Sequence, residues 1–129
     1  MIIIDEKLLD QHRGAGPCDW CKKPFLRREP HHLHRRGMGG GHRLDISCNI
    51  AALCRGCHES AEAGRITRED MLALVAQREG VHQRDMERAL SFFNHADKGN
   101  DREALQRKAN MYLHGAALGL VLLAIEGMA

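Results

Sequence analysis

Two Cys-x2-Cys pairs, far apart in the chain, place the strongest constraint on how this sequence can fold. The pairs are Cys18–Cys21 and Cys54–Cys57. Each pair can offer two thiolates to one ion, and two pairs complete a tetrahedral four-thiolate zinc site with Zn–S distances near ~2.3 Å. The 32 residues between Cys21 and Cys54 exceed the spacing of a compact zinc ribbon. The pattern therefore predicts a structural zinc site with an insertion between its two halves.

The cysteine count favours metal binding over a disulfide framework. The chain has five cysteines, an odd number, and Cys48 lies outside both pairs, so we expect it to be a small apolar strand residue. This usage is typical of a reducing compartment, and the N-terminal residues carry no secretory signal, so we expect a cytoplasmic protein. The longest apolar stretch, 116–125, covers about half of the roughly 20 residues that a membrane span requires. We therefore expect no membrane partner.

Positive charge is concentrated between residues 27 and 43, although the net charge of the 129-residue chain is only +2. This segment contains five arginines and several histidines but only one acid, Glu29. Because arginine side chains match the geometry of phosphate groups, the segment suits a phosphate-rich ligand such as nucleic acid. A solvated basic loop would have the same composition, so charge alone leaves both interpretations open.

The first half of the chain has the turn residues of a small α+β domain. Glycine and proline residues separate short segments of helical and extended character. Four glycines in five residues make 37–41 a loop. The second cysteine pair falls at the start of the last predicted helix of this half. The predicted elements are a helix at 5–13, a strand at 29–33, a returning strand at 45–53 and a helix at 57–63.

The second half of the chain is predicted to be entirely helical. The three expected helices cover 67–80, 83–96 and 101–127, with Thr67 as an N-cap and Gly80 as a stop signal. After Leu113 the last helix is apolar on nearly every side, so it must be buried. It can be buried in the core or against a second copy of the chain, and a homodimer through this helix is one of these two interpretations.

Three histidines suggest a second site. His31 and His32 are adjacent, so on an extended strand their side chains point to opposite sides and should not bind the same ion. His58 directly follows the last cysteine and is not needed for a four-thiolate zinc site. One of the pair can therefore bind a metal ion with His58, while its neighbour stays available to accept a proton. Solvated surface histidines are the alternative interpretation.

These residues resemble the HNH (His-Me finger) endonucleases, in particular a zinc-knuckle subfamily common in phages and prophages. The resemblance covers about residues 16–63 and rests on the stretch from Glu29 to Gly40 and on the stretch from Asn49 to His58. It implies a ββα-metal fold, in which a β-hairpin and a helix hold one divalent ion. It also implies a nuclease domain at 1–66 followed by a helical extension at 67–129, which would serve dimerisation or substrate specificity.

The resemblance also assigns roles to single residues. His32 matches the general base of the family, and His31 and His58 match its metal ligands. Asn49 matches the asparagine that braces the hairpin and orients the base. Glu62 occupies a position where some relatives have another histidine, one helical turn beyond His58, so it is either an extra ligand or a solvated acid.

Further candidates surround this expected centre. Glu29 resembles an acid that supports the ligands in some relatives. Arg35, Arg36 and Arg43 are expected to contact the phosphates of DNA. The catalytic ion is expected to be Mg²⁺ or Mn²⁺, with Ni²⁺ or Zn²⁺ as alternatives, because mixed ligation does not select one metal.

The function implied by the resemblance is the metal-dependent hydrolysis of phosphodiester bonds in DNA, expected to be double-stranded. His32 would take a proton from water, and one ion on His31 and His58 would relieve the developing negative charge. The alternative is a zinc-stabilised, non-catalytic DNA-binding or phage assembly module. A zinc-knuckle RNA-binding protein is a weaker interpretation, because the aromatic fraction is only 4% and single strands are usually held by stacking.

Overall fold

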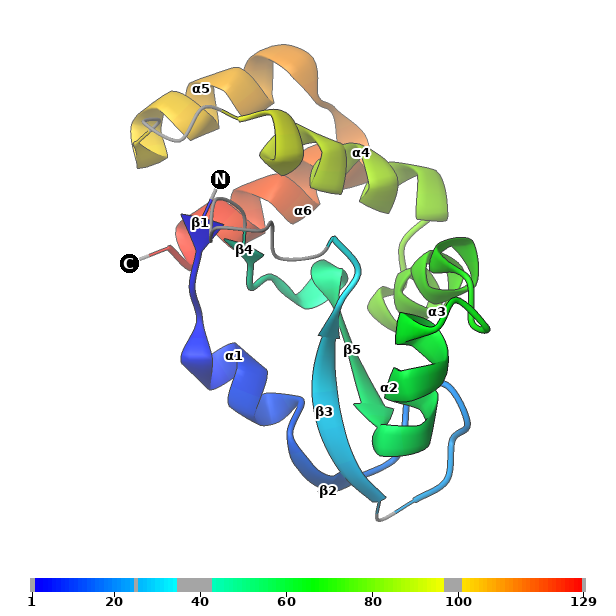
Figure 1. Cartoon of the computed structure of the whole chain (residues 1–129). Helices are drawn as coiled ribbons and strands as arrows, with labels where there is room; N and C mark the ends of the chain where they lie inside the picture. The colour runs from blue at the N-terminus through cyan, green and yellow to red at the C-terminus, as the bar shows by residue number, and fades with distance from the viewer. Residues whose placement is uncertain (1, 25, 35–42, 97–100, 129) are drawn as a thin grey trace.

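The computed structural model describes residues 2–24, 26–34, 43–96 and 101–128, and shows an α+β protein with a small sheet and a helical C-terminal half (Figure 1). The predicted fold class is confirmed at this level. Arg35, Arg36 and the predicted glycine loop lie outside the described residues. None of the described helices is long and apolar enough to cross a membrane.

A three-stranded antiparallel sheet occupies the first half of the chain. Its strands are β2 (Gly14–Gly16), β3 (Leu26–His32) and β5 (Ile50–Cys54), in the order β2-β3-β5. In the β3–β5 pair, His31 lies opposite Ala51 and His32 lies opposite Ile50. Because side chains alternate along a strand, the two histidines project from opposite faces of this sheet.

Helices lie on both sides of the sheet. Helix α2 (Arg55–Glu62) follows β5 directly and lies beside one face, while α1 (Glu6–Gln11) lies on the other side (Figure 1). A second pair of strands, β1 (Ile2–Ile3) and β4 (Arg43–Leu44), runs parallel next to α6. The sheet therefore presents His31 to α2 and His32 to the α1 and β4 side.

Two differences from the predicted elements of the first half have clear causes. The returning strand begins only at Ile50, because Ser47–Asn49 forms a 3-10 turn (η1), and Cys48 is buried in that turn rather than in a strand. The segment 14–16, which is not among the predicted strands, forms β2. There the Arg28 side chain covers Gly16 so closely that a Cβ atom would lie 2.7 Å from it.

The described residues of the C-terminal half form four helices instead of the predicted three. As expected, the Thr67 side chain caps α3 (Arg68–Glu79), and Gly80 ends it with φ 69°. The long predicted last helix is divided, because Leu113 and His114 are extended and Gly115 adopts φ 61°. The remaining helices are α4 (Gln83–His95), α5 (Arg102–Tyr112) and α6 (Gly115–Glu126).

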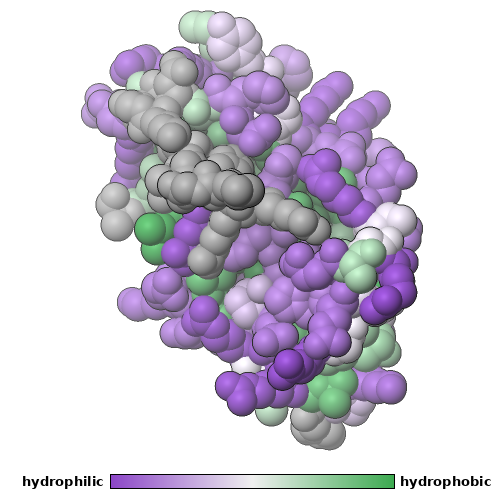
Figure 2. All heavy atoms as spheres, viewed as in Figure 1, coloured by the Kyte–Doolittle hydropathy of each residue, from purple (hydrophilic) through white to green (hydrophobic). Residues whose placement is uncertain are grey.

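One apolar cluster joins the two halves. It contains buried side chains from Ile3 in β1 to Ile125 in α6. Helix α6 contributes the buried Val121 and Ile125 to it, while Leu123 remains 68% exposed. Figure 2 shows that hydrophilic residues cover most of the visible face. The division at residue 66 and a dimer through the last helix both remain predictions.

Candidate metal and active site

The four cysteines of the two pairs converge in the structure. Cys18 and Cys21 come from the turn before β3, Cys54 ends β5, and Cys57 lies in the first turn of α2. Their Sγ atoms all lie within 4.8 Å of one another, and Cys21 and Cys54 are 4.0 Å apart. Sulfurs at the corners of a zinc tetrahedron are about 3.8 Å apart, given a Zn–S bond of about 2.3 Å. The cluster therefore fits a structural metal such as zinc.

The electrostatics of this cluster are those of a cation site. Burial opposes ionisation of Cys18, but backbone N–H groups, including that of Cys54 at 3.4 Å from its Sγ, lower the pKa of this thiol to about 7. Burial and the neighbouring thiols of Cys54 and Cys18 raise the pKa of Cys57. Four thiolates cannot coexist here without a compensating positive charge, and a bound metal ion would supply that charge.

Asp19 attaches the first cysteine pair to the rest of the fold. Its Oδ2 atom accepts hydrogen bonds from the backbone N–H of Ala52 and from Nη1 of Arg78, both at 2.8 Å. Its own N–H donates to the Ala52 carbonyl at 2.8 Å. These bonds link the turn that carries Cys18 to β5 and α3, so they position two thiols opposite the other two.

A second cluster of potential metal ligands lies where β3 meets α2. His31, His58 and Glu62 each place one ligand atom within 4.8 Å of the others. Nδ1 of His31 is 3.2 Å from Oε1 of Glu62, and Nε2 of His58 is 3.6 Å from the same oxygen. The two rings meet edge to face with centroids 5.2 Å apart. His31 is buried, whereas Glu62 is half exposed, so the cluster opens towards solvent on one side.

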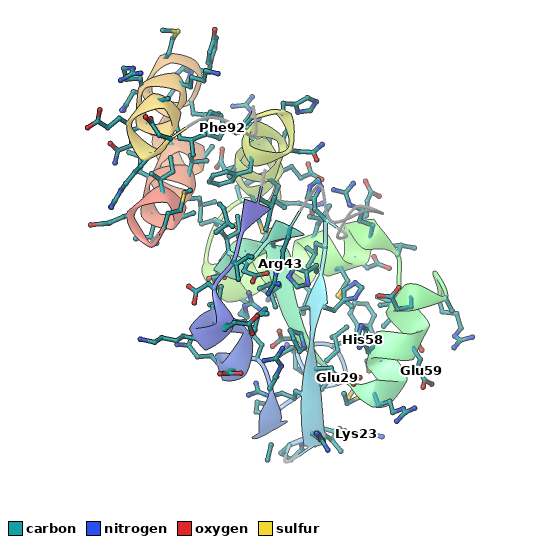
Figure 3. The ribbon with its side chains drawn as sticks, turned by 60° about the vertical axis from the view of Figure 1, so that its left-hand side comes forward. Lys23, Glu29, Arg43, His58, Glu59 and Phe92 are labelled. Atoms are coloured by element: carbon teal, nitrogen blue, oxygen red, sulfur yellow. The ribbon has the colours of Figure 1, made fainter. Side chains whose placement is uncertain are left out.

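Glu29 supports His58 from behind. Its Oε1 atom lies 3.1 Å from Nδ1 of His58, so it fixes the ring with Nε2 directed at the cluster. Figure 3 shows Glu29 and His58 facing each other across the space between β3 and α2. A carboxylate bound to the second ring nitrogen is the usual partner of a histidine that binds metal, because it sets the tautomer and makes the ring a better donor.

His32 lies on the other face of β3 and contacts a buried acid. Its Nε2 atom is 2.8 Å from Oδ1 of Asp45, a side chain with no exposed area. No second hydrogen-bond partner of the His32 ring occurs among the described residues. The ring itself is 10% exposed. Asp45 thus binds Nε2 of His32, and Nδ1 is the ring nitrogen left to accept a proton.

Asp45 accepts several hydrogen bonds. Arg43 donates to both of its oxygens at 2.7–3.1 Å, and the N–H of Asp5 donates to Oδ2 at 2.9 Å. Burial opposes ionisation of Asp45, but the Arg43, Asp5 and His32 hydrogen bonds outweigh it and lower the pKa of the carboxyl. No local pattern in the sequence indicated this arrangement, since Asp45 stands at the far end of the loop after His32.

Asn49 connects the chain segments that lie before and after residues 35–42. It is fully buried, and its Oδ1 accepts the N–H of His34 at 2.8 Å, while Nδ2 donates to the Leu44 carbonyl at 2.9 Å. The backbone carbonyl of Asn49 also accepts the N–H of Leu33 at 2.8 Å. This side chain therefore spans the chain on both sides of residues 35–42 and braces the end of β3.

Arg43, one of the predicted DNA-contacting arginines, has two carboxylate partners within the protein. It binds Asp45 and also Glu6 at 3.0 Å, and its side chain is 18% exposed. These partners raise the pKa of Arg43. Figure 3 shows Arg43 and His58 on opposite sides of β3. Its predicted contact with DNA stays a prediction, as do those of Arg35 and Arg36, which lie outside the described residues.

Comparison of the chain with protein-family models, with curated proteins and with solved structures gives no match. The geometry alone therefore has to support a function. The fold brings together the four cysteines that were predicted to bind zinc. It also brings together, at a second site, His31, His58, Glu62 and Glu29. It separates His32 from that second site by the thickness of a strand.

Proposed function

We propose that this protein is a metal-dependent HNH-type endonuclease that hydrolyses phosphodiester bonds in DNA. The observation that carries the proposal is the convergence of His31, His58 and Glu62 at the junction of the β3–β5 hairpin and α2. A hairpin followed directly by a helix, with ligands on both, is the arrangement that a ββα-metal centre requires. The four-cysteine cluster lies at the other end of the same helix and would hold the hairpin and helix together.

The donor set fits a divalent ion. His31 and His58 offer imidazole nitrogens and Glu62 offers a carboxylate, a combination that suits Mn²⁺, Ni²⁺ or Zn²⁺ and also accepts Mg²⁺. When bound, the ion would supply positive charge to the scissile phosphate and to the departing oxygen. Three protein ligands leave coordination positions for substrate and water. Glu29 would keep the His58 ring in its binding orientation.

His32 is the proposed general base, and Asp45 is the residue that positions it. With Nε2 bonded to the Asp45 carboxylate, the ring would accept a proton from water at Nδ1. The carboxylate would also stabilise the imidazolium that results, as buried acids do in other histidine-dependent hydrolases. Asn49 would keep the end of β3, and with it the His32 backbone, fixed against the opposite end of the loop.

Nicking of supercoiled plasmid tests this function. The zinc-loaded protein is incubated with plasmid and Mg²⁺, Mn²⁺ or Ni²⁺, beside His32→Ala, His58→Ala and the control His12→Ala, whose histidine lies at the end of α1. We expect metal-dependent nicking by the parent and the control, and a loss of roughly 10²–10⁴-fold for His32→Ala. No nicking with any metal would instead favour a zinc-stabilised DNA-binding or assembly module.

A further inference from the structure

Three adjoining hollows lead from the second metal cluster to the C-terminal helices. The first, of about 240 Å³, includes His31 and Arg68, and the second, of about 250 Å³, includes Arg68, His34 and Ser91. The third is a groove of about 680 Å³ that begins at Ser91. Successive hollows share Arg68 and then Ser91, so each hollow adjoins the next.

The groove at the far end of this path combines basic and aromatic side chains. It lies between α4 and the α5–α6 corner, and no acidic residue is found among its described lining residues. Arg88 is exposed and forms no ion pair within the described part of the chain. The lining side chains relevant to binding are Arg88, Phe92, His95, Lys108, Tyr112 and His114.

The two aromatic rings are placed to receive a flat ligand. Phe92 contacts Phe93 edge to face, with ring centroids 5.5 Å apart, and Phe93 is fully buried, so the Phe92 ring is fixed. Figure 3 shows Phe92 in the space between α4 and α5. Tyr112 is 69% exposed at the end of α5. Aromatic and cationic side chains lining one groove are the composition of a single-strand binding site.

We propose that this groove binds single-stranded DNA, with Arg88 contacting phosphate and Tyr112 and Phe92 stacking on bases. A DNA duplex exposes only the edges of its bases, in its major and minor grooves. An unpaired strand exposes the faces of its bases as well as its phosphates, so it can bind in a narrow groove of the protein. The identification of the polymer as DNA rests on the proposed function. The substrate class that follows is DNA in which an unpaired strand leaves the cleavage site and continues along α4.

This proposal is compatible with the low aromatic content of the chain. There are only five aromatic residues, one tryptophan, one tyrosine and three phenylalanines, which argued against a single-strand binder. Two of the five line this one groove. A whole-chain fraction does not reveal such a local concentration.

Binding of a fluorescein-labelled oligothymidylate of about 10 nucleotides tests the proposal, since site sizes of about 4–16 nucleotides are usual. Anisotropy is measured with the zinc-loaded full chain and no added Mg²⁺ or Mn²⁺, so that binding is separate from cleavage. Arg84→Ala is the matched control for Arg88→Ala, because both arginines are exposed on α4 one turn apart and Arg84 does not line the groove.

We expect Arg88→Ala and Tyr112→Ala each to weaken binding about 10-fold, and Arg84→Ala to leave it nearly unchanged. Arg88→Ala should also reduce the slope of log K against log salt concentration by about 0.7, whereas Tyr112→Ala should not. Equal effects of Arg84→Ala and Arg88→Ala would overturn the proposal. So would Arg88-dependent binding that is tighter for a duplex or for polyglutamate than for oligothymidylate.

The outcome is distinguishable from a failure of the proposed function. If the protein binds oligothymidylate through Arg88 and Tyr112 but never nicks plasmid, the proposed binding groove stands and the proposed nuclease activity is refuted. If the protein nicks plasmid but Arg88→Ala and Tyr112→Ala do not change oligothymidylate binding, the proposed groove is refuted and the proposed nuclease activity stands.

Discussion

The carboxylate of Asp45 lies 2.8 Å from Nε2 of His32, although the two residues are 13 positions apart in the chain. Asp45 is fully buried and also binds Arg43, so this carboxylate is a fixed reference point for the His32 ring. The pair joins the end of β3 to the residue that follows β4, on the two sides of residues 35–42. The proposed base is thus oriented by a residue outside the family pattern.

Asp45→Asn should reduce plasmid nicking on the order of 10²-fold if the carboxylate positions His32. The amide keeps the shape of the side chain but loses the charge that stabilises a protonated ring. His32→Ala combined with Asp45→Asn should be no slower than His32→Ala alone, because the carboxylate acts through the ring. Nicking by Asp45→Asn at the parent rate would contradict a positioning role.

The same substitution should affect stability in a pH-dependent way. The folded-state pKa of Asp45 is lowered, so its ionised form stabilises the fold above the ordinary carboxyl pKa of 3.8, and this contribution is lost as the pH falls below that value. At pH 7, Asp45→Asn should lower the free energy of unfolding by about 3 kcal/mol, because it leaves a largely buried Arg43 with one partner fewer.

Urea unfolding at pH 7 and at pH 3 measures this difference. The gap between parent and Asp45→Asn should be large at pH 7 and should shrink as the pH falls through the range in which Asp45 takes up its proton. A gap that stays constant over the whole range would show that the carboxylate charge contributes nothing to stability.

Cys54→Ser should release the structural metal, while Cys48→Ala should retain it. Cys54 contributes to the four-thiolate cluster, whereas Cys48 is buried in the η1 turn outside the cluster. Metal content by elemental analysis should be one zinc per chain for the parent and for Cys48→Ala. Cys54→Ser should contain less zinc and melt at a lower temperature, since zinc binding contributes to folding. Full zinc content in Cys54→Ser would refute the four-thiolate site.

Glu62→Gln should raise the Mn²⁺ concentration needed for half-maximal nicking by about 10-fold, because a neutral amide is a poorer ligand than a carboxylate. Glu59→Gln is its control on the same helix, since Glu59 pairs with Arg55 and lies outside the cluster. If the two variants needed the same Mn²⁺ concentration, Glu62 would be a solvated helix acid.

Local spacing predicted the parts of the structure that depend on neighbouring residues. Each Cys-x2-Cys pair places two sulfurs within one turn of the chain. Thr67 and Gly80 mark the start and the end of α3, because a threonine side chain can cap a helix and a glycine adopts the left-handed conformation that ends one. The opposite orientations of His31 and His32 follow from strand geometry alone, and the bond between His32 and Asp45 is consistent with it. The choice of His31, and not His32, as the partner of His58 was implied by a resemblance rather than by spacing.

Other features depend on contacts that no local pattern contains. The Asp45–His32 bond forms across a loop, and β2 exists only because β3 provides a partner for three small residues. The break between α5 and α6 was missed because residues 113–127 read as one continuous apolar helix. Only the extended Leu113 and the left-handed Gly115 reveal the corner that forms one wall of the groove.

Binding of Mn²⁺ to the zinc-loaded protein, followed by electron paramagnetic resonance of the free ion, tests the central claim most directly. The account predicts one bound Mn²⁺ per chain in the parent and in His12→Ala, and loss of that ion in His31→Ala and in His58→Ala while zinc content stays the same. Mn²⁺ binding that is unchanged in His31→Ala and His58→Ala would contradict the claim that these two rings and Glu62 form a divalent metal site.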